Sequence, residues 1–216
     1  MAYVISICGT KGGIGKSTIA VTIGVGFHRA GKSTLLVDAD EQGTLRNWAG
    51  KGAEDSVDIP PVVAMDARNL ARDLQRVGKQ YDVIVIDTPA RLGREARAAM
   101  VLSDLTLLPV ARGLPGLAAL EDTLRIVEDA QAIRPDLVVR VVLNRVDRTT
   151  LSRVTRENIE AMKLDILGEG LHDRVAFDEA MSMGTDAVGY EPESEAATEA
   201  KQLFQDVNKI MRRNAK

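Results

Sequence analysis

The amino-acid sequence predicts an α/β protein with a doubly wound, mostly parallel sheet and helices on both of its faces. Three observations lead to this fold class. Short runs of Val, Ile and Leu recur along the chain, longer segments with helical periodicity lie between them, and a glycine-rich turn follows the first run. Such alternation implies crossover connections, and these place helices on both faces of a single sheet.

Six apolar runs are the expected strands. Most are apolar on successive residues instead of alternate ones, which is typical of parallel strands buried on both faces. The expected strands span residues 3–8, 34–39, 61–65, 82–87, 105–110 and 137–144. Ligands of such sheets bind beyond the carboxyl ends of the strands, so the residues after each run are the first candidates for a functional site.

Helical periodicity is clear in two of the intervening segments. Residues 67–77 place apolar side chains on one face and three arginines on another, and residues 117–133 repeat the pattern. Pro135 follows the second segment closely and predicts its end. A further helix is expected to begin near Lys16, directly after the glycine-rich turn.

Length and composition suit one compact domain over residues 1–216. Hydrophobic residues make up 45% and charged residues 27% of the 216, which excludes a wholly disordered or fibrous chain. The amino-terminal segment lacks the basic start of a signal peptide, and no apolar run approaches the ~18 residues of a membrane span. A single cysteine, Cys8, excludes an internal disulfide and the cysteine-ligated iron–sulfur sites. We therefore expect a cytoplasmic protein.

The charges are nearly balanced overall but segregated along the sequence. Lys plus Arg number 28 and Asp plus Glu 31, a net charge of −3 that by itself argues against a dedicated nucleic-acid binder. Residues 140–156 nevertheless carry five arginines against one aspartate, and residues 200–216 five basic residues against one aspartate. Residues 165–199 between them hold ten acidic residues and Arg174. Each block could also be a solvated helix face, which is what charge runs usually are.

The glycine-rich turn has the composition of a phosphate-binding loop. Residues 9–18 read GTKGGIGKST, between a buried strand and an expected helix. Glycines let consecutive backbone N–H groups point at an anion, and the helix adds its positive dipole end. In such loops the Lys16 side chain reaches the β- and γ-phosphates and the Ser17 hydroxyl ligates Mg²⁺. The strict GxxxxGK[ST] pattern is not met, because Thr10 stands where the first glycine is expected.

The segment KGGIGKST resembles the deviant Walker A motif of the ParA/MinD group of P-loop ATPases. In that group a second lysine, here Lys11, crosses the interface of an ATP-bound dimer and contacts the phosphates of the partner. The resemblance implies ATP and Mg²⁺ as cofactors, an ATP-dependent homodimer, and catalytic roles for Lys11 and Lys16. It implies nucleotide contacts from Lys11, Gly12, Gly13, Ile14, Gly15, Lys16, Ser17 and Thr18.

Two further segments resemble motifs of the same group. Residues 38–43, DADEQG, are similar to its switch I motif DxDPQ, with Glu41 in place of proline. The resemblance implies that Asp40 orients the attacking water and that Asp38 lies near the Mg²⁺. Residues 84–89, IVIDTP, resemble a Walker B motif in which Asp87 holds Mg²⁺. The implied metal ligands are thus Ser17, Asp38 and Asp87, and the resemblance places Asn144 against the adenine base.

A ParA-type partition or positioning ATPase is the function that these motifs favour. The resemblance implies that the ATP dimer binds DNA without sequence preference and that a ParB-like adaptor stimulates hydrolysis. The basic segment 140–156 suggests DNA contacts from Arg145, Arg148 and Arg153, and Arg174 is the next candidate. The length places the chain among small ParA proteins that lack an amino-terminal helix-turn-helix.

Two alternatives stay open. A MinD-like membrane ATPase needs a carboxy-terminal amphipathic helix, and one apolar stripe runs beside basic residues there: Leu203, Phe204, Val207, Ile210 and Met211. A terminal helix docked on the sheet is the commoner explanation of such a stripe, so stable membrane insertion is not expected. A small-molecule P-loop enzyme of the dethiobiotin synthetase type is less favoured, because it does not need the DxDxQ switch. The isolated His28 and His172 give little support for histidine-dependent catalysis.

Overall fold

A computed structural model gives the structure of the protein, and it describes residues 2–66, 68–91 and 93–214. Its centre is a seven-stranded sheet in the order β3-β2-β4-β1-β5-β6-β7, and every strand pair is parallel. The strands are β1 Tyr3–Ile7, β2 Thr34–Asp38, β3 Val62–Ala64, β4 Val83–Asp87, β5 Leu105–Ala111, β6 Val138–Val146 and β7 Leu171–His172. The fold class predicted from the sequence is confirmed.

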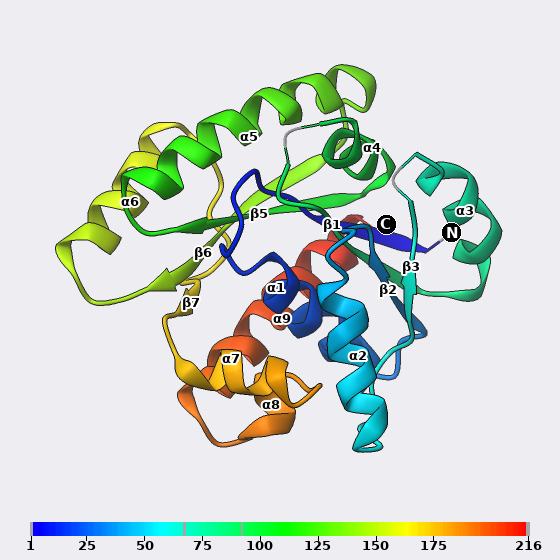
Figure 1. Cartoon of the computed structure of the whole chain (residues 1–216). Coiled ribbons are helices and arrows are strands. Elements are labelled where there is room, and N and C mark those ends of the chain that lie inside the picture. Colours follow the sequence, from blue (N-terminus) through cyan, green and yellow to red (C-terminus); the bar gives the residue numbers. More distant parts are fainter. Residues whose placement is uncertain (1, 67, 92, 215–216) are drawn as a thin grey trace.

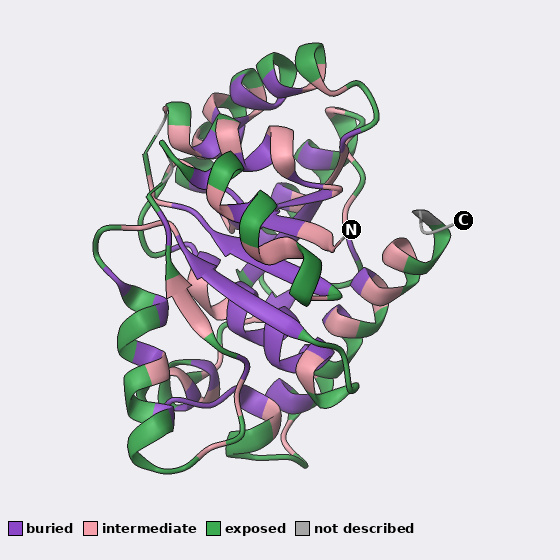
Figure 2. Cartoon of the chain, turned by 90° about the vertical axis from the view of Figure 1, so that its right-hand side faces the viewer, coloured by how far each residue is buried: buried purple, intermediate pink, exposed green. Residues whose placement is uncertain are grey.

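Helices cover both faces of this sheet (Figure 1). One face carries α3 Leu70–Val77, α4 Arg94–Leu102, α5 Leu114–Ile133 and α6 Thr150–Ala161. The other carries α1 Lys16–Arg29, α2 Thr44–Glu54, α7 Val175–Ser182, α8 Ala187–Tyr190 and α9 Glu195–Asn214. A short 3₁₀ turn, η1 Gly78–Gln80, leads from α3 to β4. The result is a three-layered α/β arrangement in which the central strands are buried (Figure 2).

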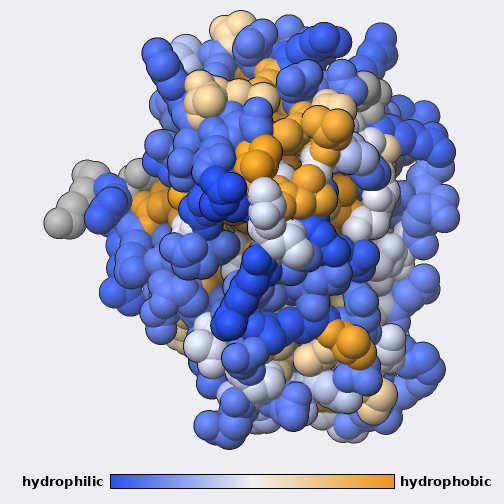
Figure 3. Space-filling model, turned by 90° about the vertical axis from the view of Figure 1, so that its left-hand side faces the viewer, coloured by the Kyte–Doolittle hydropathy of each residue, from blue (hydrophilic) through white to orange (hydrophobic). Residues whose placement is uncertain are grey.

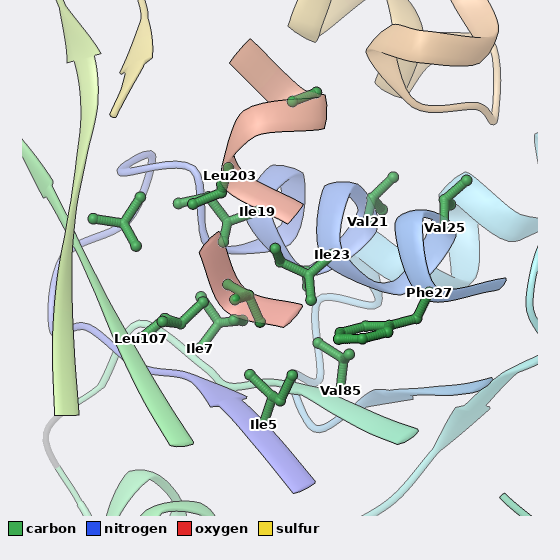
Figure 4. Close-up of a cluster of buried hydrophobic side chains, with 14 of the residues drawn as sticks. Ile5, Ile7, Ile19, Val21, Ile23, Val25, Phe27, Val85, Leu107 and Leu203 are labelled. Atoms are coloured by element: carbon green, nitrogen blue, oxygen red, sulfur yellow. The ribbon is translucent and has the colours of Figure 1, made fainter. Parts of the chain in front are cut away.

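Alternation along each strand explains why the apolar runs are continuous. Side chains of successive residues point to opposite faces, so a strand between two helical layers needs an apolar residue at every position. Ile5 and Ile7 of β1 pack toward α1 with Phe27, whereas Cys8 at the end of the strand joins the core on the other face. Figure 4 shows the first of these cores, to which α9 contributes Leu203.

The carboxy-terminal helix α9 docks on this core. Leu203 and Val207 are buried, and Phe204 meets Phe27 of α1 edge-on, with ring centroids 5.1 Å apart. Ile210 and Met211 are partly buried against the same core. The apolar stripe of the last helix is therefore used inside the domain. No helix in the described part of the chain is long and apolar enough to cross a membrane.

The structure departs from the expected elements at several ends. Helix α5 begins at Leu114 instead of residue 117, and β6 extends to Val146, two residues beyond the expected strand. The two-residue strand β7 was not predicted, since so short an edge strand leaves no periodic pattern. Helix α3 begins at Leu70; Ala67 and Lys216, which belong to the expected helix and to the carboxy-terminal basic block, lie outside the described residues.

Candidate nucleotide-binding site

A glycine loop joins β1 to α1 at the carboxyl edge of the sheet. Gly15, the residue before α1, has a left-handed backbone (φ 84°), and a Cβ there would lie 2.0 Å from Nδ2 of Asn144. Only glycine fits this position. No side chain caps α1 and its first turn holds no acidic residue, so its free N–H groups and dipole face the loop. The loop is therefore built to receive an anion.

Lys16 is the buried cation of this loop. Lys16 is only 8% exposed, and its Nζ donates a hydrogen bond to the carbonyl oxygen of Lys11 at 3.2 Å. Burial lowers the pKa of Lys16, and the nearby carboxylates of Asp87 and Asp40 act in the opposite direction. Lys11, Gly12 and Gly13 are exposed, and the Lys11 side chain has no hydrogen bond or ion pair within the described ranges. The two lysines of the motif thus lie in opposite environments.

Ser17 and Asp87 bring the P-loop and the end of β4 together. The Ser17 hydroxyl donates to Oδ2 of Asp87 at 2.5 Å, while Oδ1 of the same carboxyl is buried and accepts no hydrogen bond. Burial raises the pKa of Asp87 to about 7; the Ser17 hydrogen bond and the charge of Lys16 lower it, and Asp38 and Asp40 raise it further. A buried carboxylate oxygen without a partner beside a hydroxyl fits a divalent cation.

Mg²⁺ would find two protein ligands here, Ser17 and Asp87. No group of three or more His, Cys, Asp or Glu side chains in the described part of the chain could hold a metal ion. Mg²⁺ is commonly bound by one or two protein oxygens together with waters and the phosphates of a nucleotide. The donor set therefore suits a metal that arrives with its nucleotide instead of a resident ion.

Asp38 is the third predicted metal ligand, and its role toward the metal stays a prediction. It lies beside Asp87 in the register of β2 and β4, but both of its oxygens have protein partners. Oδ1 accepts the backbone N–H of Asp40 at 3.1 Å, and Oδ2 accepts N–H groups of Arg46 from the backbone at 3.1 Å and from Nε at 3.4 Å. The carboxylate of Asp38 therefore organises the switch I loop, a use that its spacing in the sequence does not reveal.

Asp40 lies in that loop, partly buried, with Oδ1 accepting the backbone N–H of Gln42 at 3.0 Å. Its charge acts on both Lys16 and Asp87, so the loop places it close to the P-loop cation. This placement is compatible with the water-orienting role that the resemblance implies, which stays a prediction.

The side chain of Asn144, in β6, is hydrogen-bonded to the backbone of the P-loop. It is 5% exposed, and its Nδ2 donates to the carbonyl oxygen of Ile14 at 2.7 Å. A cavity of about 20 Å³ lies beside it, and Gly15, Thr18, Asn144, Arg145, His172, Asp173, Arg174, Phe177 and Asp178 line it. The unpredicted β7 brings the segment after residue 171 to this place. Contact of Asn144 with a base stays a prediction, since its amide already holds the loop.

Larger cavities lie away from the glycine loop. One of about 700 Å³ is lined by Tyr3, Val83, Lys32 and Arg134, and therefore lies at the amino ends of β1 and β4. In parallel α/β sheets ligands bind at the opposite edge. Cavity size alone thus does not locate the site, and the chemistry of the glycine loop does.

The predicted DNA contacts are not a patch of free positive charge. Arg145 lies 3.5 Å from Asp178, Arg153 lies 2.7 Å from Glu157, and Arg174 pairs with both Glu195 and Glu199. Arg148 makes no ion pair with any residue that the structure describes. Arg140, Arg145 and Arg156 of the basic block pair with Asp165, Asp178 and Glu169 of the acidic block, so the acidic block neutralises part of the basic one. Contact of these four arginines, Arg145, Arg148, Arg153 and Arg174, with DNA stays a prediction.

The first strand of the parallel sheet leads through a glycine loop into an uncapped helix. A Lys-Ser pair at the start of that helix faces an aspartate at the end of a neighbouring strand. These features define a P-loop nucleotide-binding protein. Residues 5–187 match the CobQ/CobB/MinD/ParA nucleotide binding domain. The chain therefore belongs to this family, and the family resemblance of its motifs is confirmed.

Relatives match over nearly the whole chain. It is 28% identical over 210 residues to the Maintenance of carboxysome distribution protein A of Halothiobacillus neapolitanus, which covers 95% of this chain and 96% of that protein. It is 28% identical over 254 residues to the Sporulation initiation inhibitor protein Soj of Bacillus subtilis, with 96% and 98% covered. The septum site-determining protein MinD of Pyrococcus horikoshii, solved with Mg-ADP, shares the fold with a TM-score of 0.78, 23% identity and 98% of each chain covered.

Proposed function

We propose that this protein is a ParA-type ATPase that couples ATP hydrolysis to the positioning or partition of a cargo. The observation that carries the proposal is the Ser17–Asp87 hydrogen bond beside the buried Lys16, with one oxygen of Asp87 left unpartnered. The similarity of the chain to a protein for the maintenance of carboxysome distribution supports the positioning role.

Each site residue has a defined part in hydrolysis. The N–H groups of the glycine loop and Lys16 bind the phosphate oxygens and stabilise the charge that develops on them. Ser17 and Asp87 would hold Mg²⁺, which would supply positive charge to polarise the phosphate oxygens. Asp40 orients the attacking water. Because the ammonium group of Lys16 is partly desolvated, water screens its charge little, and its electrostatic attraction to a phosphate is stronger.

An ATP-dependent homodimer completes the proposal. Lys11 is exposed and unpaired within the described residues, as a side chain that reaches a partner's phosphates needs to be. Nearby, the hydroxyl of Thr10 donates to the carbonyl oxygen of Ala119 in α5, and Leu114 at the start of α5 is 80% exposed to solvent. Leu151 of α6 is 49% exposed beside it, within 3.4 Å of a Cβ placed on Gly113. Figure 3 shows apolar side chains gathered on this otherwise hydrophilic side of the molecule.

The dimer binds duplex DNA through its phosphate backbone, and a ParB-like adaptor stimulates hydrolysis. Of the four candidate arginines, Arg148 is the best placed, because the others are engaged by carboxylates. Two copies in a dimer double the number of phosphate contacts, so binding depends on the nucleotide state.

One experiment separates the candidate functions. The protein is incubated with ATP-Mg²⁺, with ADP-Mg²⁺ or without nucleotide, and its retention on non-specific duplex DNA and on anionic liposomes is measured alongside ATP turnover. ATP-dependent retention on DNA alone supports the partition ATPase. Retention on liposomes selects a MinD-like membrane ATPase, against the docking of α9, and ATP turnover without either selects a small-molecule enzyme.

A further inference from the structure

The switch I loop is built around one guanidinium group, that of Arg46 in the first turn of α2. Its Nη2 donates to the carbonyl oxygens of Asp40 at 3.3 Å and of Glu41 at 3.2 Å. Its Nε donates to the carboxylate of Asp38 at 3.4 Å, and its backbone N–H to the same oxygen at 3.1 Å. A single side chain thus bridges the end of β2 and the two residues that follow it in the loop.

Burial makes the ion pair with Asp38 decisive for the loop. The Asp38 side chain is 0% exposed, whereas the Arg46 side chain is 45% exposed and covers it from the solvent side. The carboxyl groups of Asp38 and Asp40 both act on Asp87, and those of Asp40 and Asp87 act on Lys16. Arg46 supplies the second positive charge of this cluster, since a buried carboxylate needs a partner.

The backbone leaves space for this guanidinium at Gly43. Gly43 has φ 69°, and a Cβ on it would lie 2.7 Å from Nη2 of Arg46. The N–H of Gly43 donates to the Asp40 carbonyl oxygen at 3.0 Å, which closes the turn. The planar fork of arginine donates from several nitrogens in fixed directions, and a lysine ammonium cannot reproduce that geometry.

We propose that Arg46 is a positioning residue for ATP hydrolysis: its guanidinium holds the switch I backbone so that the Asp40 carboxylate faces the P-loop. The proposal rests on the proposed ATPase function. Arg46 itself contacts neither the loop lysines nor Ser17 in any described interaction, so it acts through Asp38 and the carbonyl groups of residues 40 and 41. Such positioning changes the rate of the chemical step and leaves ground-state nucleotide binding nearly unchanged.

The test uses Arg46→Lys and Arg46→Met in the full chain, with Arg125→Met as the matched control. Arg125 is an 81% exposed arginine of α5, and its side chain lies 3.7 Å from Asp122. We expect kcat for ATP to fall about 10-fold or more in both Arg46 variants, with KM and the affinity for Mg-ADP within about threefold of the parent. In Arg46→Ala, added methylguanidinium should restore part of kcat, at concentrations that leave the control unaffected.

A second readout does not depend on hydrolysis. Amide hydrogen exchange of Asp40, Gln42, Gly43 and Arg46 in the nucleotide-free protein should be about 10-fold faster in Arg46→Met than in the parent. The double variant Asp38→Asn/Arg46→Met removes the unpaired buried charge and keeps the test valid if the single variant unfolds.

The outcomes separate the two proposals. Unchanged exchange at these amides, or a kcat within twofold of the parent, overturns the role of Arg46. Equal losses of kcat and nucleotide affinity also overturn it, because they show a merely structural effect. If the parent binds Mg-ATP without hydrolysing it, the proposed function fails, while faster exchange in the variant still supports the contact of Arg46 with the loop.

Discussion

The hydroxyl of Ser17 donates a hydrogen bond to Oδ2 of Asp87 at 2.5 Å across 70 positions of sequence, at the carboxyl edge of the sheet. The second oxygen of Asp87 is buried without a hydrogen-bond partner. Neighbouring parallel strands β1 and β4 bring these groups together, with Ile7 opposite Asp87 in register. The proposed metal-binding half of the site therefore depends on the pairing of these strands.

Replacing Asp87 should change the pH dependence of stability. The folded-state pKa of about 7 lies above the ordinary 3.8, so the folded protein holds a proton that the unfolded chain releases between about pH 4 and 7. Stability of the nucleotide-free protein therefore falls as the pH rises through this window. Asp87→Asn removes the buried charge and should be more stable than the parent by on the order of 1–3 kcal/mol at pH 8, with little difference near pH 4.

Urea unfolding in EDTA at these two pH values measures the effect, and Asp82→Asn at the other end of β4 is the control. An equal difference between Asp87→Asn and the parent at both pH values would contradict the assignment of the charge to Asp87. The same variant should lose Mg²⁺-dependent tightening of ADP binding.

Lys16→Ala should weaken ATP binding roughly 100-fold, since it removes a charge-assisted contact with phosphate from a poorly solvated site. Titration with a fluorescent ATP analogue measures the affinity, and Lys79→Ala, at an exposed position in η1, serves as the control. Normal ATP affinity in Lys16→Ala would remove this lysine from the nucleotide site.

Lys11→Ala should separate nucleotide binding from dimerisation. The Lys11 side chain is exposed, and Lys16 contacts only the backbone carbonyl oxygen of Lys11. The nucleotide affinity of the variant monomer should therefore stay within about threefold of the parent. ATP-dependent dimerisation, measured by analytical ultracentrifugation with and without ATP, should be lost. A variant that still dimerises with ATP would show that Lys11 does not act across the interface.

Arg148 and Arg174 should respond differently to charge reversal. Arg148→Glu should weaken duplex DNA binding about 10-fold and flatten its salt dependence, because this arginine makes no ion pair with any described residue. Arg174→Glu should mainly lower the melting temperature, because Arg174 binds Glu199, which also accepts the backbone N–H of His172. Filter binding across a salt series and thermal unfolding measure the two effects; a larger loss of DNA affinity in a well-folded Arg174→Glu would reverse the assignment.

Much of the fold follows from local sequence. Runs of Val, Ile and Leu with no polar alternation predicted six of the strands to within two residues at each end. The missed strand, β7, is two residues long and depends on pairing with β6 for its conformation. The sequence of α9 does not decide whether its apolar face binds a membrane or packs on the core, because an apolar stripe indicates only that one face of the helix avoids water. In the structure the stripe faces inward, where Phe204 packs against Phe27 of α1 and Leu203 and Val207 are buried.

The sequence by itself determined the phosphate-binding loop, because glycines, Lys16 and Ser17 are adjacent in the chain and act through local backbone geometry. Tertiary structure alone decided which carboxylates serve that loop. In the folded protein one oxygen of Asp87 has no hydrogen-bond partner, whereas Asp38 forms an ion pair with Arg46. Arg145 and Arg174 form ion pairs with acidic residues. Charge interactions depend on distance and burial, and neither can be read from positions along the chain.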